Sequence, residues 1–254
     1  MLKIPSIAGL LLSGCLLSVQ AEPASLTVYT EHFPPYNFHQ NDKIVGINTE
    51  LVQAMCEKTA IHCQFELYPW LRAYENARRN SRGALFSTSR IPQREAKFQW
   101  VGPLIHSTAF LYRLRSRQEV NPKNLQEAKH FVIGVAHGDV YEIYLKSIGF
   151  DYGTNLVGFV SKADSIGPFL QHKVDLIIGS PKVIQVWLQQ FDKDSSELEA
   201  VIEFDMLGLN YLALNLAVEP ELIEQLQQAL DELKSSGEAE RITQRYLQPG
   251  QSKH

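Results

Sequence analysis

The sequence predicts an α/β protein with two sheet-containing units. Strand and helix patterns alternate over residues 26–88, and a second alternation begins near residue 131, after a strand pattern at 110–114 that leaves the first series. Strand, helix, strand, helix, strand in this order is typical of a parallel sheet with right-handed crossover connections. The length of the chain allows one large domain or two lobes.

The first unit is expected to contain three strands and two helices. They are, in order, a strand at 26–30, a helix at about 49–58, a strand at 64–67, a helix that packs through Ala73, Tyr74 and Ala77, and a strand at 84–86. Ile47, Leu51 and Met55 recur at helical spacing, which assigns them to the core and not to a site.

The second unit repeats this alternation. Its expected elements are a strand at 131–135, a helix at about 140–148, a strand at 156–160, a helix at 165–171 and a strand at 174–178. A strand at 211–216 could return the chain to the first unit. A helix then begins at Pro220 and ends at Gly237, and a short final helix carries Ile242.

Residues 1–21 have the features of a signal peptide. Lys3 gives a positive start, residues 7–17 are apolar, and Val19-Gln20-Ala21 is a small-residue cleavage site. We therefore expect export to the periplasm. The alternative is a lipid anchor at Cys15, because residues 12–15 resemble a bacterial lipoprotein box.

The charge of the chain argues against nucleic acid as a partner. Loss of the leader with Lys3 takes the basic residues from 24 to 23 against 28 acidic residues, a formal charge of −5. There is no Walker or Rossmann glycine pattern and no H-E-x-x-H motif, and no cofactor is expected. His137 and Asp139 could touch a metal, but two ligands do not make a site, so no metal is expected either.

Two cysteines, Cys56 and Cys63, follow the leader. In an oxidising compartment they are expected to form a disulfide. Cys56 falls late in a helix pattern and Cys63 opens a strand pattern, so the bridge would join a helix to a strand.

The stretch 83–103 carries the first candidate site. An apolar run stops at Ser87-Thr88-Ser89, and Pro92 suits the first position of a helix. Hydroxyls and two arginines, Arg90 and Arg94, thus gather where a strand ends and a helix begins, a place where ligands and anions bind in open α/β sheets. The alternative interpretation is an ordinary strand–turn–helix with surface arginines.

Aromatic residues follow the other two strands of the first unit. Tyr36, with Phe33 and Phe38 as weaker candidates, lies in a loop that two prolines keep from being helical. Trp70 and Arg72 follow the second strand. These rings either pack their loops onto the core or form a stacking wall for a ligand.

In combination these features resemble the family 3 extracellular solute-binding proteins, typified by the lysine/arginine/ornithine- and histidine-binding proteins. The resemblance covers essentially the whole mature chain. It rests on the aromatic opening at 29–36, Gly46-Ile47-Asn48-Thr49-Glu50-Leu51, the Cys56–Cys63 spacing, Ser87-Thr88-Ser89 followed by Arg94 and Phe98, Ile133-Gly134-Val135 to Gly138, and Leu170 to Asp175.

The resemblance implies a type II periplasmic binding protein fold, in which each of two lobes is a mostly parallel sheet flanked by helices. Residues 22–108 and 217–254 would form lobe 1, and residues 109–216 would form lobe 2. The lobes would close on a small-molecule ligand by a hinge motion. The closed form, expected to be a monomer, would dock on an inner-membrane ABC permease or a sensor.

The resemblance also assigns roles to residues. Ser87 and Ser89 would hydrogen-bond the ligand, Arg94 would pair with its carboxylate, and Tyr36 would stack on its body. The chain departs from the family pattern in the second lobe. Asp139 stands where a threonine is usual.

A second departure is Ser180, which stands near a position that is often aspartate. One interpretation is that the charge that would meet an ammonium group has moved to Asp139, and the alternative is that the ligand is not an α-amino acid. Arg72 and Arg90 add positive charge on the first lobe. The expected ligand is an amino acid or a related small polar or carboxylate solute.

A catalytic alternative exists on the same fold, because the cyclohexadienyl dehydratases resemble these proteins. Asp139 or Glu142 could supply the general acid for such a reaction if it reached the cleft. Gly179-Ser180-Pro181 lacks the second glycine of a nucleophile elbow. A purely structural protein is a third interpretation, which the residues at successive strand ends disfavour.

Overall fold

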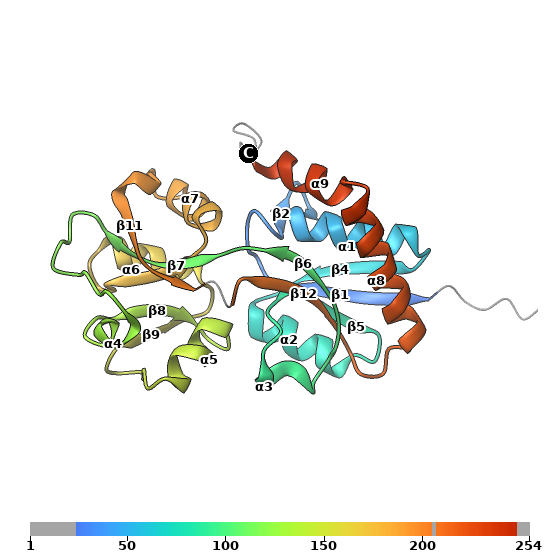
Figure 1. The fold of residues 1–254 in the computed structure, drawn as a ribbon, viewed down its shortest axis with the longest axis horizontal. Helices are drawn as coiled ribbons and strands as arrows, with labels where there is room; N and C mark the ends of the chain where they lie inside the picture. The colour runs from blue at the N-terminus through green and yellow to red at the C-terminus, as the bar shows by residue number, and fades with distance from the viewer. Residues whose placement is uncertain (1–23, 205–206, 248–254) are drawn as a thin grey trace, which may run out of the picture.

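The structure of the chain, a computed structural model, describes residues 24–204 and 207–247. Two α/β lobes lie side by side (Figure 1). The expected signal peptide, residues 1–21, and the alternative lipid site at Cys15 lie outside the described residues. Within the part of the chain that is described, no helix has both the length and the apolar character needed to cross a membrane.

The first lobe is built on a five-stranded sheet with the order β4-β1-β5-β12-β6. Its strands are β1 (Ser25–Thr30), β4 (His62–Leu67), β5 (Gly83–Thr88), β6 (Gln99–His106) and β12 (Leu209–Leu214). β1 pairs in parallel with β4 and β5, whereas β12 runs antiparallel to β5 and β6. Four strands therefore point the same way, which confirms the expected mostly parallel sheet.

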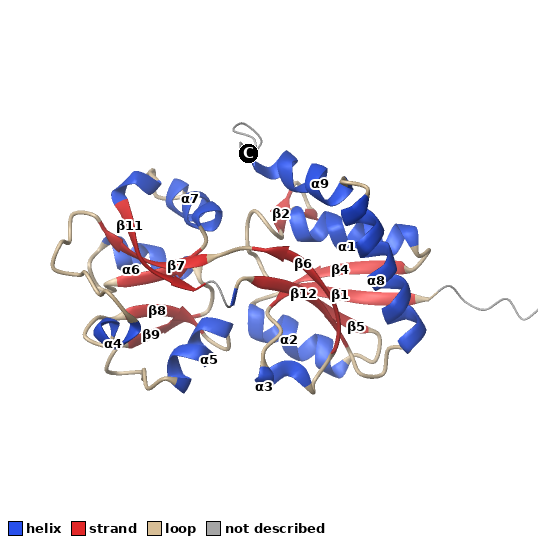
Figure 2. Cartoon of the chain, in the orientation of Figure 1, coloured by secondary structure: helices blue, strands red, loops and turns tan. Residues whose placement is uncertain are grey.

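Helices cover both faces of this sheet (Figure 2). The further elements of the lobe are the hairpin β2 (Phe38–Gln40) and β3 (Lys43–Val45) and the helices α1 (Ile47–Lys58), α2 (Trp70–Arg79), α3 (Pro92–Glu95), α8 (Pro220–Ser235) and α9 (Glu238–Leu247). α1 and α8 share one buried cluster, which contains Val52, Met55 and Leu226. α2 packs on the opposite face through Ala73 and Ala77.

Gly46 fixes where α1 begins. Its φ of +126° lies in a region that favours glycine, and a Cβ atom at this position would overlap the backbone of Tyr36. The amide N–H of Asn48, in the first turn of α1, donates to the carbonyl oxygen of Tyr36 at 2.9 Å. The aromatic loop after β1 is thus held directly against the helix.

The second lobe has a sheet of the same design, with the order β11-β7-β10-β8-β9. Its strands are β7 (Ala109–Leu114), β8 (Ile133–Ala136), β9 (Leu156–Phe159), β10 (Leu176–Gly179) and β11 (Leu198–Phe204). β8 pairs in parallel with β9 and β10, and β7 is antiparallel to both of its neighbours. In each lobe, the reversed strand is the one that arrives from the other lobe.

Side chains alternate between the two faces of this sheet, as the period of a strand requires. The helical elements of the lobe are α4 (Leu125–Ala128), α5 (Val140–Ser147), η1 (Ala163–Ser165), α6 (Ile166–Leu170), α7 (Pro181–Gln189) and η2 (Ser195–Glu197). Leu176 and Ile178 of β10 pack with α5, whereas Ile177 packs with α6 and α7.

Among the residues that the structure describes, the chain crosses between the lobes twice. The first crossing lies between His106 of β6 and Ala109 of β7, and the second lies between Phe204 of β11 and Leu209 of β12. The assignment of residues 109–216 to lobe 2 therefore ends too late. β12 belongs to the sheet of lobe 1, where it pairs with β5 and β6 and buries its leucines in that lobe's core.

The expected disulfide between Cys56 and Cys63 is present, with the two Cα atoms 6.2 Å apart. It joins the last turn of α1 to the first residues of β4, as the positions of the two cysteines indicate.

We expect reduction of this disulfide to lower the free energy of unfolding by about 2.5 kcal/mol, because the bond closes a short loop in the unfolded chain. Urea unfolding followed by far-UV circular dichroism, with and without dithiothreitol, measures the difference. The double variant Cys56→Ser/Cys63→Ser should lose the same amount and respond no further to reductant. A wild-type midpoint that does not move with reductant would contradict this.

Candidate functional site

The carboxyl ends of strands from both sheets face the junction of the lobes. Residues that follow β1 and β5 come from lobe 1, and residues that follow β8, β9 and β10 come from lobe 2. They enclose a cavity of about 40 Å³. It is lined by Phe33, Ser87, Ser89, Ser107, Ala109, Asp139, Val140, Tyr141, Lys162, Gly179, Ser180, Leu207 and Asn210. In open α/β sheets this end of the strands is where ligands bind.

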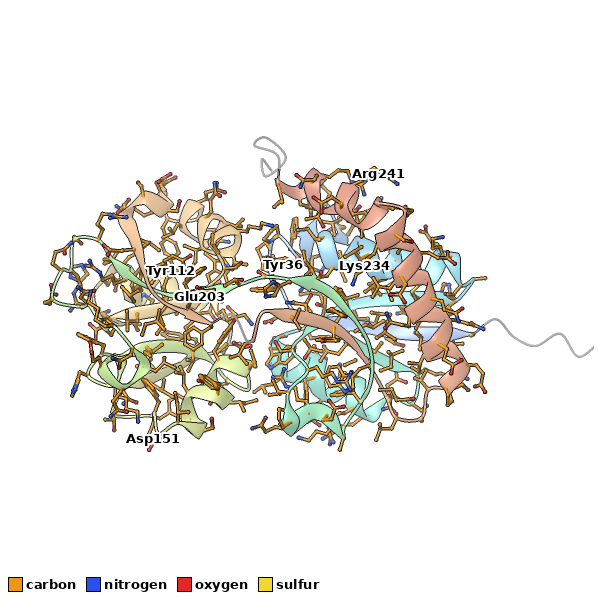
Figure 3. All side chains as sticks on the ribbon, viewed as in Figure 1. Tyr36, Tyr112, Asp151, Glu203, Lys234 and Arg241 are labelled. Atoms are coloured by element: carbon orange, nitrogen blue, oxygen red, sulfur yellow. A yellow bond between two sulfur atoms is a disulfide. The ribbon has the colours of Figure 1, made fainter. Side chains whose placement is uncertain are left out.

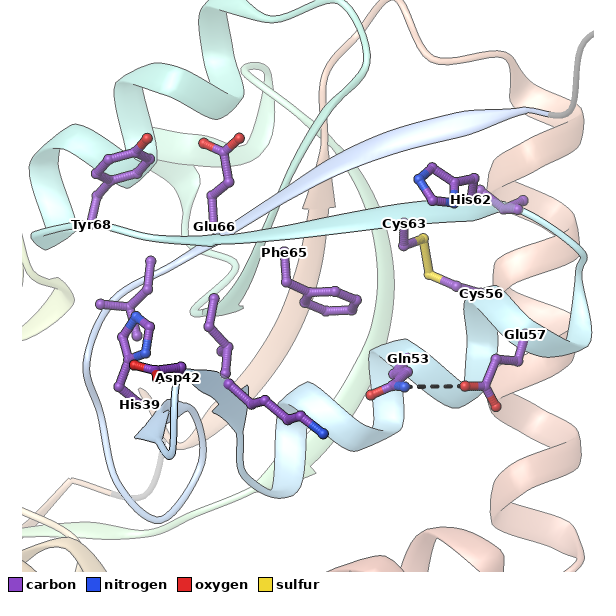
Figure 4. Close-up of a pocket in the computed structure, with 14 residues that line it drawn as sticks. His39, Asp42, Gln53, Cys56, Glu57, His62, Cys63, Phe65, Glu66 and Tyr68 are labelled. Carbon is purple, nitrogen blue, oxygen red and sulfur yellow. Dashed lines mark hydrogen bonds between the residues drawn. A yellow bond between two sulfur atoms is a disulfide. The ribbon is translucent and has the colours of Figure 1, made fainter.

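Two larger hollows lie elsewhere. One, of about 660 Å³, is an open groove of lobe 1 between the β2–β3 hairpin, α1 and β4, beside the disulfide (Figure 4). The other, of about 450 Å³, lies between the loop after β1, α9 and α7. The small cavity is the candidate site because hydroxyl side chains of lobe 1 and charged side chains of lobe 2 line it at the strand ends.

Lys162 forms the centre of the charged groups. Its Nζ lies 3.0 Å from Glu31 Oε1 of lobe 1 and 3.3 Å from Asp139 Oδ1 of its own lobe. The three side chains are 12%, 6% and 9% exposed, respectively. Burial alone would lower the pKa of Lys162, but attraction by Asp139 and Glu31 raises it overall. Burial raises the pKa of Glu31, and Lys162 opposes that rise.

Arg94 is buried and spans the junction. One guanidinium nitrogen donates to Thr88 Oγ1 at 3.1 Å and to the Ser89 carbonyl at 3.3 Å, and the other donates to the Gly138 carbonyl of lobe 2 at 3.0 Å. Burial lowers the pKa of Arg94, against the attraction of Asp139. Arg94 does not line the cavity, so its expected pairing with a ligand carboxylate stays a prediction.

Trp70 reaches the same acceptor. Its Nε1 donates to the Gly138 carbonyl at 2.8 Å, and the Arg94 guanidinium lies 5.0 Å from the centre of its ring. Trp70 is therefore a contact between the lobes and not a wall of the cavity.

Glu142 holds the loop that presents the Gly138 carbonyl to lobe 1. Its carboxylate accepts hydrogen bonds from the Gly138 amide, at 2.5 Å, and from the Tyr152 hydroxyl. The Tyr152 oxygen also lies 3.1 Å from His137 Nδ1. A side chain at Gly138, whose φ is +71°, would overlap Leu71. The loop is thus shaped to place one backbone oxygen opposite lobe 1.

Ser87 and Ser89 line the cavity, but both hydroxyls have protein partners, and their contact with a ligand stays a prediction. Ser87 Oγ donates to Asn37 Oδ1 and accepts from Asn48 Nδ2 at 2.8 Å. Ser89 Oγ donates to the Leu207 carbonyl at 3.3 Å. Ser180 is buried in the cavity wall at the start of α7.

Tyr36 lies at the junction of the lobes (Figure 3), but it is 1% exposed and stands behind the cavity wall. Its ring stacks on Phe33 with the ring centres 5.3 Å apart, and its hydroxyl lies 2.6 Å from Ser107 Oγ. Phe33, the weaker candidate, is the aromatic residue of that loop that lines the cavity. The predicted stacking of Tyr36 on a ligand stays a prediction.

Two predicted residues lie away from the cavity. The Arg72 guanidinium sits 4.2 Å from the ring centre of Tyr68 on the exposed side of α2. Arg90 turns toward α3 and pairs with Glu95, with Nε and Oε2 2.8 Å apart. Arg72 contacts Tyr68 and Arg90 contacts Glu95, both away from the cavity. Neither arginine therefore adds charge to the site.

Sequence reasoning missed Glu31 and Lys162. Glu31 directly follows β1, and Lys162 follows β9 by three residues. The rule that strand ends carry the site would have selected Glu31. No pattern around Lys162 distinguishes it from a surface lysine.

Two α/β lobes that enclose a polar site between their strand ends are typical of the two-lobed periplasmic binding proteins. The chain belongs to one family within this class, the bacterial extracellular solute-binding proteins, family 3, whose family model matches residues 26–249. This confirms the family that the sequence motifs indicate.

Two proteins of Escherichia coli (strain K12) are similar to the chain over most of its length. One, ABC transporter arginine-binding protein 1, is 22% identical over 95% of this chain and 97% of its own. The other, putative ABC transporter arginine-binding protein 2, is 23% identical over 94% of this chain and 96% of its own length.

Solved structures show the same fold. An ancestral arginine-binding protein bound to arginine has a TM-score of 0.76 at 20% identity and covers 89% of this chain and 99% of its own. A histidine kinase sensor domain similar to periplasmic binding proteins also has a TM-score of 0.76 at 20% identity, with 89% and 96% covered. At this identity the likeness supports the fold.

The contrast between Arg94 and Arg90 is testable. We expect Arg94→Ala to lower the free energy of unfolding by about 2 kcal/mol, because it removes buried hydrogen bonds of a charged group. Arg90→Ala should cost no more than about 0.5 kcal/mol, since its ion pair is exposed. Urea unfolding of both variants measures the difference. Equal losses would show that the hydrogen bonds of Arg94 contribute nothing beyond a surface ion pair.

Proposed function

We propose that the chain binds a small polar solute, an amino acid or a related carboxylate, between its lobes and presents the closed form to an inner-membrane ABC permease or a sensor. The observation that carries this proposal is that both lobes line one cavity with polar groups: Ser87 and Ser89 from lobe 1, and Asp139, Lys162 and Ser180 from lobe 2. A solute that contacts both lobes favours the closed arrangement, because it binds that arrangement better than an open one.

The closed cavity is small for such a solute. Its volume of about 40 Å³ is well below the roughly 300–1,000 Å³ of ordinary ligand pockets. Admission of an amino acid therefore requires the lobes to separate. The two crossings, between His106 and Ala109 and between Phe204 and Leu209, are where a hinge motion would act.

The comparisons support an amino acid as the class of solute. The two E. coli relatives are named as arginine-binding proteins of ABC transporters, and a similar ancestral protein has been solved with arginine and with glutamine. The likeness to a sensor domain supports a sensor as the alternative partner. A family described as extracellular, together with the leader pattern and the disulfide, supports the periplasm as the location. We propose that the chain acts as a monomer, since both sides of the cavity come from one chain.

The catalytic alternative receives less support. Glu142 is absent from the cavity wall, and its carboxylate is engaged by the Gly138 amide and Tyr152. Asp139 reaches the cavity but is paired with Lys162. The relatives are named as binding proteins, so we propose binding without turnover.

A thermal-shift screen of amino acids and dicarboxylates tests the proposal. A solute that binds the folded chain at 100 times its dissociation constant stabilises it by about 2.7 kcal/mol, so one chemical class should raise the unfolding temperature by several degrees. Isothermal titration calorimetry then gives the affinity. A panel in which no member shifts the wild type would contradict the proposal.

A matched pair of variants locates the site. Ser89→Trp should abolish binding of the strongest solute, because the indole is larger than the cavity and would occupy the space between the lobes. Ser81→Trp, in the exposed turn before β5, should bind as the wild type does. If Ser89→Trp retained full affinity in the calorimeter, the solute would bind elsewhere.

A further inference from the structure

Lys162 enters the junction from the second lobe. It follows β9, and its backbone is held there because its carbonyl accepts from Ser165 Oγ at 2.7 Å. From this position its side chain extends to Glu31, which is in the other lobe. The cation that links the two lobes is therefore part of the chain itself.

The surroundings of this ammonium are those of a complete cation site. Its nitrogen donates to the carboxylates of Glu31 and Asp139, and it lies 4.7 Å from the ring centre of Phe33. An ammonium has three donors and no acceptor, and a ring face attracts cations. Two carboxylates accept hydrogen bonds from Lys162 and one aromatic face lies beside it, and the side chain also lines the cavity.

The charge of the site depends on this residue. Without Lys162, Glu31 and Asp139 would be two buried carboxylates without its ammonium, and buried charges are costly unless they are paired. Arg94 does not take the place of Lys162, because its hydrogen bonds are made to Thr88 and to the backbone oxygens of Ser89 and Gly138.

We propose that Lys162 determines the specificity of the cleft: its ammonium occupies the cation position between Glu31 and Asp139, so the cleft accepts neutral or acidic solutes and rejects those with a cationic side chain. The solute class in this proposal rests on the proposed function, whereas the cation position does not. A cationic solute would have to displace Lys162 or bring an unpaired positive charge into the closed cleft.

The first experiment tests the cation position without any solute. Lys162→Ala removes the side chain beyond Cβ, and n-propylammonium has the three carbons and the nitrogen that are lost. Propylammonium chloride should raise the unfolding temperature of Lys162→Ala by several degrees relative to sodium chloride at the same ionic strength. 1-Propanol, a neutral molecule of the same size, should not, and neither the wild type nor Lys173→Ala, which alters an exposed lysine, should respond to the amine.

Failure of propylammonium to distinguish Lys162→Ala from these controls would overturn the proposal. If Lys162→Ala does not fold, its refolding yield with and without propylammonium gives the same comparison. The variant Lys162→Ala/Glu31→Gln removes one carboxylate and should weaken the rescue. A rescue of undiminished size would also overturn the cation position.

The second experiment tests specificity with L-arginine and L-citrulline, which differ chiefly in the charge of the side chain. The wild type should bind citrulline at least tenfold more tightly than arginine in the calorimeter. Lys162→Gln should shift this ratio at least tenfold toward arginine. The proposal would be overturned if the wild type bound arginine more tightly than citrulline and if Lys162→Gln left the ratio of the two affinities unchanged. If no solute of the panel binds the wild type, the proposed function fails, and the propylammonium experiment still decides the cation position.

Discussion

The contact between Lys162 and two carboxylates of opposite lobes is the interaction on which the closed arrangement most depends. Glu31 and Asp139 come from different sheets, and a single ammonium reaches both. Separation of the lobes must break the pair with Glu31 and return both charges to water, whereas the pair with Asp139 can remain within the second lobe. Closure is therefore tied to the neutralisation of charge as well as to shape.

A second contact completes the junction and is of a different kind. The Gly138 carbonyl accepts from Trp70 and Arg94, and Glu142 and Tyr152 fix the loop from behind. The acceptor of this contact is a neutral backbone oxygen, whereas one of its two donors, Arg94, is charged. The two contacts lie at the ends of neighbouring strands, β8 and β9, and both depend on the parallel order of the second sheet.

Much of the fold could be predicted, because strands such as 26–30 and 131–135 and the amphipathic helix after Pro220 have strong local patterns. β6 was missed because Gly102-Pro103 interrupts its pattern, and α7 and β11 were not assigned. The boundary at residue 216 placed β12 in lobe 2, although the strand expected at 211–216 was also interpreted as a possible return to the first unit. No local pattern shows which sheet a strand joins.

The site was harder to predict than the fold. Arg90 and Arg94 have similar local settings, and only the packing of α3 decides which one is buried. The burial of Lys162 depends on Glu31, which is far away in the sequence, so no local signal could reveal it. Glu31 itself could have been found from its position after β1.

The position of β12 also bears on the order in which the lobes form. The strand lies between β5 and β6, yet it is made after the whole of the second lobe. During synthesis, the second lobe can complete its sheet once Phe204 has emerged, while the first still lacks a central strand. The lobe that contains β1 is therefore the last to be finished.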